Sequence, residues 1–282
     1  MKVSVIGCGF MALALLPLPA GAAGHGPVFG ATTPTLGRSG WSLDQAWTRR
    51  SGDAGSREQM LKTMVSFGVT ENLQLSVSFP LAMSTGQLPA ARMMSLMSSD
   101  RDVEGLAGYR FQRRMIGIGG RQESTVYVGG TIPAESTRGN ARVSSSLFIA
   151  GATGYASRSH YLWVGGGVQH YLYRGADRVG GGRFASVVYG FRPKPLRVDA
   201  SKPDARLFVE ATAEDRRPDR IGGVERPTGA RSVFVGPTTL ILYKAYAFEG
   251  GILLPAYQSV DAGRVRERLR IAVNVSYFFW LK

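Results

Sequence analysis

The sequence predicts an all-β protein, an antiparallel transmembrane β-barrel of about 12 strands that follows an N-terminal signal peptide. Three observations support this. Apolar and polar residues alternate along segments of strand length. The 37 glycines and 10% aromatic residues suit many strands and turns. Beyond residue 23 no stretch resembles a transmembrane helix, and only helices and closed barrels satisfy the backbone inside a bilayer. The alternative is a soluble all-β domain in the periplasm.

Residues 1–23 have the organisation of a secretory signal peptide. An apolar stretch, 3–18, follows Met1-Lys2 and precedes the small-residue triplet 20–22, so we expect cleavage after residue 22 or 23. Prolines interrupt the apolar stretch before it could span a bilayer as a helix. Cys8, the only cysteine, lies before this stretch ends, which argues against a lipoprotein, and the mature chain has no disulfide.

Two segments show strand periodicity most clearly, 73–79 and 268–277. In each, one face carries Leu, Ile, Val and Phe, and the other carries polar residues, as expected for lipid outside and a wet lumen inside. Most of the predicted strands match the length that a tilted strand needs to cross a bilayer. They lie near 41–49, 60–69, 73–82, 103–112, 123–132, 145–156, 161–173, 183–192, 205–214, 231–242, 246–257 and 268–280.

The connections predict how the barrel sits in the membrane. Tight turns at 70–72, 157–159 and 244–245 alternate with long loops at 83–102, 215–230 and 258–267. Outer-membrane barrels have short periplasmic turns, so both termini are expected in the periplasm. The connections 113–122 and 193–204 are too long for this rule and leave the strand count open by about two. Tyrosines gather at the predicted strand ends, as in interfacial girdles, among them Tyr109, Tyr155, Tyr161, Tyr171 and Tyr189.

A family resemblance covers most of the mature chain. It is carried by 25–30, 33–35, 40–42, 155–160, 207–210, 236–239, 246–251 and 275–279. These segments resemble a family of predicted bacterial outer-membrane transporters related to the meta-pathway proteins of phenol degradation. The resemblance implies a barrel porin or transporter and brings no catalytic residues. In such chains a terminal aromatic is read by the barrel-assembly machinery, a role that falls here to Tyr277 and Phe279, although Trp280-Leu281-Lys282 follow.

The lumen is the predicted functional site. Strand periodicity places nine charged residues of both signs on the luminal face, where they either pair to brace the lumen or line a pore: Asp44, Lys62, Glu104, Arg110, Arg206, Glu210, Glu249, Arg268 and Arg270. Residues 24–40, rich in Gly, Pro and Thr, form a periplasmic segment or a plug, and the barrel is 41–282. Met93, Met94 and Met97 are expected to fold inward as a constriction or to pack on neighbouring loops.

Three places in the sequence allow other chemistry. A mature chain beginning at Ala23 would present an amine, two amides and His25, a nitrogen set suited to copper(II) or nickel(II). His170 lies across a hairpin from the serines 144–146, so an outer-rim lipid-modifying enzyme with a Ser/His pair is an alternative. The net charge of +14 includes an arginine-rich loop, 216–231, which fits outer-membrane lipids and lipopolysaccharide rather than nucleic acid.

The sequence therefore predicts an integral outer-membrane channel or transporter for small solutes, hydrophobic or aromatic ones included, with no cofactor and no enzymatic activity. A metal-associated structural barrel is the remaining alternative.

Overall fold

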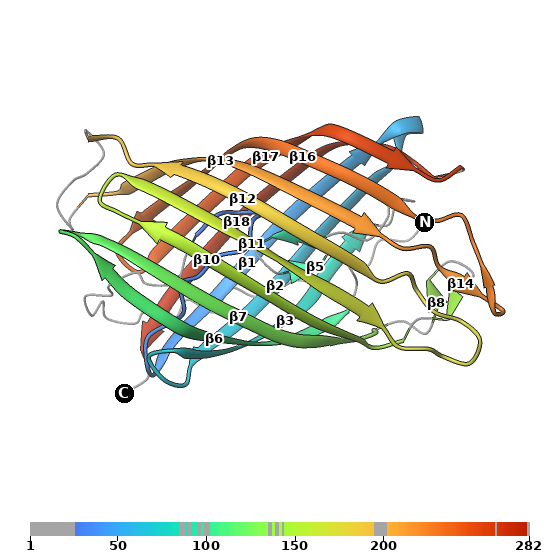
Figure 1. Ribbon diagram of the computed structural model, residues 1–282, viewed down its shortest axis with the longest axis horizontal. Helices are drawn as coiled ribbons and strands as arrows, with labels where there is room; N and C mark the ends of the chain where they lie inside the picture. Colours follow the sequence, from blue (N-terminus) through green and yellow to red (C-terminus); the bar gives the residue numbers. More distant parts are fainter. Residues whose placement is uncertain are drawn as a thin grey trace.

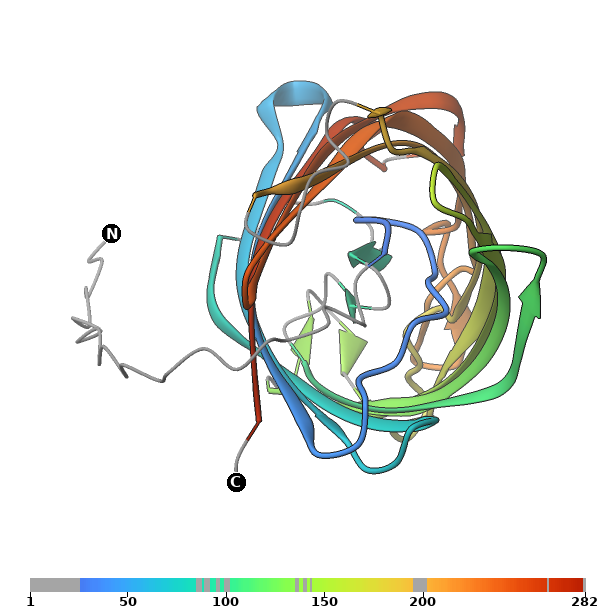
Figure 2. The same cartoon turned by 90° about the vertical axis from the view of Figure 1, so that its left-hand side faces the viewer.

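Twelve antiparallel strands form one closed barrel in the computed structural model (Figures 1 and 2), which confirms the predicted fold class and strand number. The structure describes residues 26–84, 88, 92–94, 97–98, 102–134, 137–138, 141–142, 144–194, 202–262 and 264–280. The signal-peptide prediction and His25 lie outside these residues. Within them, no helix has the length and apolar character to cross a membrane.

The barrel strands are β1 (Gly40–Gly52), β2 (Arg57–Gly68), β3 (Leu73–Ser84), β6 (Val103–Ile116), β7 (Gly120–Ile132), β10 (Ser146–Ala156), β11 (His160–Tyr171), β12 (Gly182–Phe191), β13 (Asp204–Arg216), β16 (Ala230–Tyr243), β17 (Tyr246–Val260) and β18 (Glu267–Trp280). Three short pairs lie in the connections: β4 (Arg92–Met94) with β5 (Met97–Ser98), β8 (Thr137–Arg138) with β9 (Ala141–Arg142), and β14 (Arg220–Ile221) with β15 (Val224–Glu225). A 3-10 turn, η1 (Asp53–Gly55), follows β1.

The barrel closes where the first strand pairs with the last. Trp41 of β1 lies opposite Phe279 of β18, and their rings stack 6.1 Å apart. Because β1 begins where β18 ends, we call this end of the barrel the terminal end and the opposite end the loop end. A closed barrel has no free strand edge along its wall, which removes the usual site of edge-to-edge aggregation.

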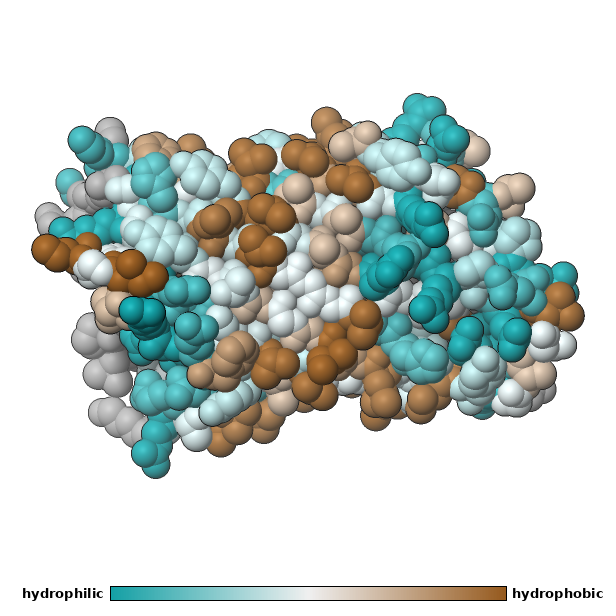
Figure 3. Space-filling model, in the orientation of Figure 1, coloured by the Kyte–Doolittle hydropathy of each residue, from teal (hydrophilic) through white to brown (hydrophobic). Residues whose placement is uncertain are grey.

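Side chains alternate across the wall as the sequence predicts. In β3, Leu75 and Val77 are 47% and 48% exposed on the outside, whereas Ser76 and Ser78 are buried on the inside. Apolar side chains on the other strands likewise form a brown belt across the middle of the outer surface (Figure 3). An outside that is apolar and an inside that is polar match a barrel surrounded by lipid.

One connection differs from the prediction. The stretch 113–122 is not a long loop, because β6 runs to Ile116 and β7 starts at Gly120. Gly117 and Gly119 adopt positive φ angles of 60° and 77°, which let three residues turn the chain. The polar and arginine-rich composition of this stretch concealed strands that extend beyond the lipid belt.

The tyrosine girdles are only partly as expected. Tyr109, Tyr155 and Tyr189 are exposed at the terminal end, consistent with an interfacial belt. Tyr161 and Tyr171 were expected in the girdles but are buried inside the barrel, 6% and 3% exposed, because their strand positions are in phase with the luminal face.

The lumen as candidate functional site

The structure places most of the predicted luminal charges inside the barrel. Seven are 7% exposed or less: Asp44, Lys62, Glu104, Arg110, Glu210, Glu249 and Arg270. Arg206 is half-buried, pairs with Asp204 at 3.0 Å and lies 5.1 Å over the ring of Tyr161. Charges this deeply buried are braced by partners, as charges away from bulk water have to be.

Arg268 is the exception, and its luminal placement is wrong. Its side chain is 74% exposed and pairs with Asp53 of η1. The pairing of β1 with β18 shifts next to Ser51, so Glu267 and Arg270 both face inward although they are three residues apart. An extra residue of this kind reverses the alternation, which strict period-two counting cannot foresee.

A segment that precedes the barrel runs inside it. Residues 26–36, which we call the luminal segment, enter at the terminal end and reach the middle of the lumen (Figure 2). Glu210, at the centre of β13, accepts hydrogen bonds from three consecutive backbone N–H groups, those of Val28 (2.7 Å), Phe29 (2.8 Å) and Gly30 (2.7 Å). Thr238 donates a fourth from β16 at 2.5 Å. The carboxylate is thus fully occupied by donors.

Other wall residues bind the backbone of the luminal segment nearer the terminal end. The Ser186 hydroxyl accepts from the N–H of residue 31 at 2.9 Å, and Gln74 accepts from the N–H of residue 36 at 2.8 Å. Thr125 and Tyr127 donate to the carbonyls of residues 33 and 32 at 2.6 and 2.7 Å. Trp163 donates to the hydroxyl of residue 33 at 3.1 Å. Backbone that would otherwise be buried without partners is therefore satisfied by the wall.

The luminal segment lies against the aromatic side of the lumen. This aromatic wall consists of Tyr127, Phe148, Tyr161, Trp163 and Phe208, all 6% exposed or less. The rings of Tyr161 and Trp163 stack 5.5 Å apart, and both contact Phe208 at about 6 Å. The luminal segment thus packs on the aromatic wall through Ala31 and Leu36.

An ion network crosses the lumen near the loop end. Arg50 pairs with Glu267 (2.7 Å) and Glu58 (3.5 Å), while Arg270 pairs with Glu214 (2.6 Å) and Glu267 (2.9 Å). The side chains of Arg50, Glu267 and Arg270 are at most 4% exposed. Arg50, Glu58 and Glu267 lie just beyond the predicted strand ends. In β1 and β2 the even-numbered residues face the lumen, as Asp44 and Lys62 do. Extending this alternation by one or two residues would have predicted Arg50 and Glu58 as luminal.

The connection between β3 and β6 also contributes to the lumen. The pair β4–β5 lies within the ring of strands in Figure 2. Met97 is 5% exposed and packs with Val28, Phe29, Phe234 and their neighbours. The expected inward fold of this connection therefore holds for Met97, whereas the side chains of Met93 and Met94 lie outside the described residues.

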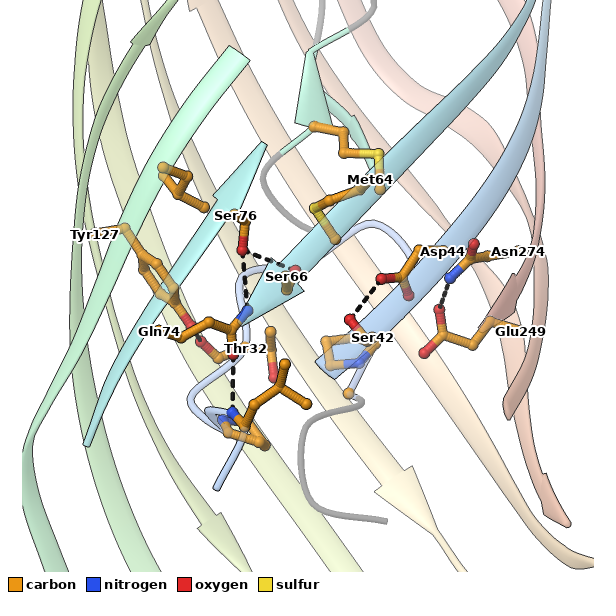
Figure 4. A pocket seen from close by; sticks show the side chains of 16 residues that line it. Thr32, Ser42, Asp44, Met64, Ser66, Gln74, Ser76, Tyr127, Glu249 and Asn274 are labelled. Atoms are coloured by element: carbon orange, nitrogen blue, oxygen red, sulfur yellow. Dashed lines mark hydrogen bonds between the residues drawn. The ribbon is translucent and has the colours of Figure 1, made fainter. Parts of the chain in front are cut away.

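A cavity of about 70 Å³ that opens to solvent remains between the luminal segment and the wall of β1, β2, β3, β17 and β18 (Figure 4). We call its hydrophilic side the polar wall: Ser42, Asp44, Ser66, Gln74, Ser76, Glu249 and Asn274. Ser42 donates to Asp44 at 2.8 Å, and Asn274 donates to Glu249 at 3.1 Å. Among the described lining residues, two are carboxylates and none is Lys or Arg.

At the loop end, several connections meet around one carboxylate. Asp219 accepts from Arg216 (3.1 Å), Arg264 (3.2 Å) and the N–H of Gly180 (2.7 Å), and its own N–H donates to Thr228 (2.7 Å). Burial opposes the charged form, but the cation of Arg216 and these hydrogen bonds outweigh it and hold the pKa of Asp219 below its usual range. The cluster ties three loop-end connections together.

The remaining predicted sites fare differently. His170 faces outward with Leu147 opposite it, while Ser146 faces the lumen and Ser144 donates to a backbone carbonyl, so neither of these two serines is placed against His170. No group of three or more His, Cys, Asp or Glu side chains suited to a metal occurs in the described part of the chain. Tyr277 and Phe279 stack 5.6 Å apart beside the seam.

Together, a closed barrel with an apolar outer belt and a polar, segment-filled lumen defines a protein of the transmembrane β-barrel class. No family model matches the sequence, and neither does any curated protein. The fold is similar to that of an outer membrane channel from Pseudomonas putida F1, with a TM-score of 0.61 and 11% identity over 87% of this chain and 97% of that one. The NanC porin gives 0.52 and 12%, over 83% and 98%. At such identities the likeness establishes the fold.

Proposed function

We propose that the protein is an outer-membrane channel for small solutes, with its terminal end in the periplasm. The observation that carries this is the lumen, a hydrophilic interior inside an apolar belt, which is the arrangement of outer-membrane barrels that enclose a water-filled channel. The fold shared with outer membrane channels supports it. The short turns at the terminal end support the orientation.

The luminal segment acts as a plug in this proposal. It covers the aromatic wall, so solutes pass along the polar wall, and small polar solutes are the favoured class while the plug is in place. Hydrophobic or aromatic solutes need the aromatic wall and therefore need the plug to leave. The two carboxylates of the cavity favour cations over anions.

Two partner assignments complete the proposal. Tyr277 and Phe279 form the assembly signal for the barrel-assembly machinery, and the arginine-rich connections of the loop end meet lipopolysaccharide and other outer-membrane lipids. A rim enzyme is not favoured, because Leu147 rather than a serine faces His170.

The test is conductance across a planar bilayer. We expect the full mature chain to conduct weakly, a chain lacking residues 24–36 to conduct more, and a chain with 26–36 replaced by an equal length of Gly and Ser to resemble the deletion. Heat-modifiable migration on detergent gels shows that each variant folds. If all three folded chains fail to conduct, the channel proposal is wrong; equal conductance from all three rejects the plug but not the channel.

A further inference from the structure

The β6–β7 hairpin continues past the barrel wall at the terminal end. Residues 111–116 are exposed on both faces of the hairpin. Its most exposed apolar side chains, including one in the turn, are Phe111 (61%), Met115 (63%) and Ile118 (96%). This hairpin reaches furthest along the axis at that end in Figure 1, and its extremity is brown in Figure 3. We call residues 111–121 the terminal hairpin.

Among the described residues, one edge of the terminal hairpin has no neighbouring strand. β3 pairs with β6 only as far as Tyr109, and the carbonyl of Asn72 accepts one more hydrogen bond, from the N–H of Arg110. In the described chain no strand continues beside 111–116 on that side, whereas β10 covers the edge of β7 from Arg121 onward. A row of backbone donors and acceptors is therefore presented outward, the arrangement to which an extended peptide adds as a further strand.

Lipid does not account for these exposed apolar side chains. Tyr109 is half-exposed at the level of the interfacial belt. The seven residues from there to Ile116 carry the strand up to about 18 Å further along the axis at a normal rise and tilt. The headgroup layer is only about 5 to 7 Å thick. The tip thus lies in the aqueous compartment, which is the periplasm in the orientation proposed above.

The charge of the hairpin selects the partner. Residues 111–121 contain three arginines and no acidic residue. Arg113 and Arg121 share one carboxylate with Arg110, that of Glu123, at 3.7 and 3.6 Å, so the hairpin stays cationic. A second copy of this chain would place arginines opposite arginines, which is destabilising across paired strands. An acidic segment would place carboxylates there instead.

We infer that the edge 111–116 binds an extended, acidic peptide segment of a partner protein by strand addition, with the apolar residues of that segment packing on Phe111, Met115 and Ile118. This surface is independent of the lumen and would stand even if the channel proposal fell.

The experiment uses the folded mature chain in lipid nanodiscs and a labelled peptide, acetyl-EVEVEVE-amide, followed by fluorescence anisotropy. We expect the acidic peptide to bind about tenfold or more tightly than its lysine counterpart, KVKVKVK. Two further acidic peptides carry methyl groups on alternate backbone nitrogens, one peptide on the odd positions and the other on the even positions. One of the two should lose binding, because it lacks the N–H groups that face the edge. R114E should weaken binding about tenfold, and R226E, an exposed arginine at the loop end, should not.

Three outcomes would overturn the inference: equal binding of the acidic and basic peptides, full binding by both methylated peptides, or equal effects of R114E and R226E. A dye at residue 118, attached to I118C in the mature chain, which otherwise contains no cysteine, tests the lipid alternative. Quenching of that dye by quencher-bearing lipids would place the tip in the bilayer and also reject strand addition.

Discussion

Replacement of Glu210 by Gln should release the luminal segment. The carboxylate accepts three backbone N–H groups, and hydrogen bonds to a charged acceptor are worth about 1.5 kcal/mol or more each. A neutral amide keeps at most two of them at about 1 kcal/mol each and turns its own N–H₂ toward a third donor, leaving a buried N–H unsatisfied at a cost of about 1 to 3 kcal/mol. The free energy of docking of the luminal segment should therefore weaken by about 4 kcal/mol, which shifts the equilibrium between the docked and the released segment about a thousandfold.

Single-channel recording in planar bilayers measures this directly. We expect E210Q to spend far more time in the higher-conductance state that the chain without residues 24–36 shows permanently. E225Q, which changes an exposed glutamate in a loop-end connection, is the control and should behave as the unmodified chain. In the chain that lacks the segment, E210Q should add nothing. Unchanged gating by E210Q, together with a clear effect of the deletion, would refute the role of Glu210.

Three further predictions test the braces and the fit of the segment. The pKa of Asp219 is below its usual value in the folded protein, so the stabilisation that its carboxylate gives the loop-end cluster is complete above about pH 4 and is lost as pH falls through the folded pKa. Hydrogen exchange across 217–229 should therefore accelerate below pH 4. In D219N it should be fast at every pH. E267Q breaks a buried ion network and should lower the free energy of unfolding by about 3 to 5 kcal/mol, which is measured as a lower temperature of unfolding in the gel-shift assay. R268Q removes one partner of an exposed ion pair next to this network and should lower it by less than about 1 kcal/mol. Equal losses in the two variants would contradict the assignment of inward and outward faces. G30A should open the channel, since a Cβ there would lie 2.4 Å from a Val188 methyl, while G37A has open space and should not.

The wall could be predicted from the sequence because its pattern is local. Period-two alternation needs only a few consecutive residues, so the twelve strands and most of the luminal positions follow from it. The failures occur where the alternation is interrupted. Arg268 was misplaced by the irregularity beside Ser51, and Arg50 was missed because the polar ends of strands beyond the lipid belt look like loops.

The contents of the lumen could not be predicted, because they depend on contacts between distant parts of the chain. Glu210 binds residues about 180 positions earlier, and Arg50 binds a glutamate 217 positions later. The alternation along a strand predicts that a charged side chain faces the lumen, but it does not predict which other strand supplies the partner of that side chain. The sequence likewise indicated a plug-like composition for 24–40 without indicating which side of the lumen the segment covers.

The way in which the segment is held has a consequence for gating. Wall side chains bind mainly its backbone: the N–H groups of residues 28–31 and 36 and the carbonyls of 32 and 33. Water can satisfy the same groups when the segment leaves a wet lumen, so each bond contributes only its net exchange with water, about 0.5 to 1.5 kcal/mol for neutral pairs. Among these hydrogen-bond acceptors Glu210 is the one charged group, so it makes the largest single polar contribution to the affinity for the segment. A segment held by many weak exchanges and one strong one can be displaced by a solute that competes for a single carboxylate, which suits a removable plug better than a permanent core.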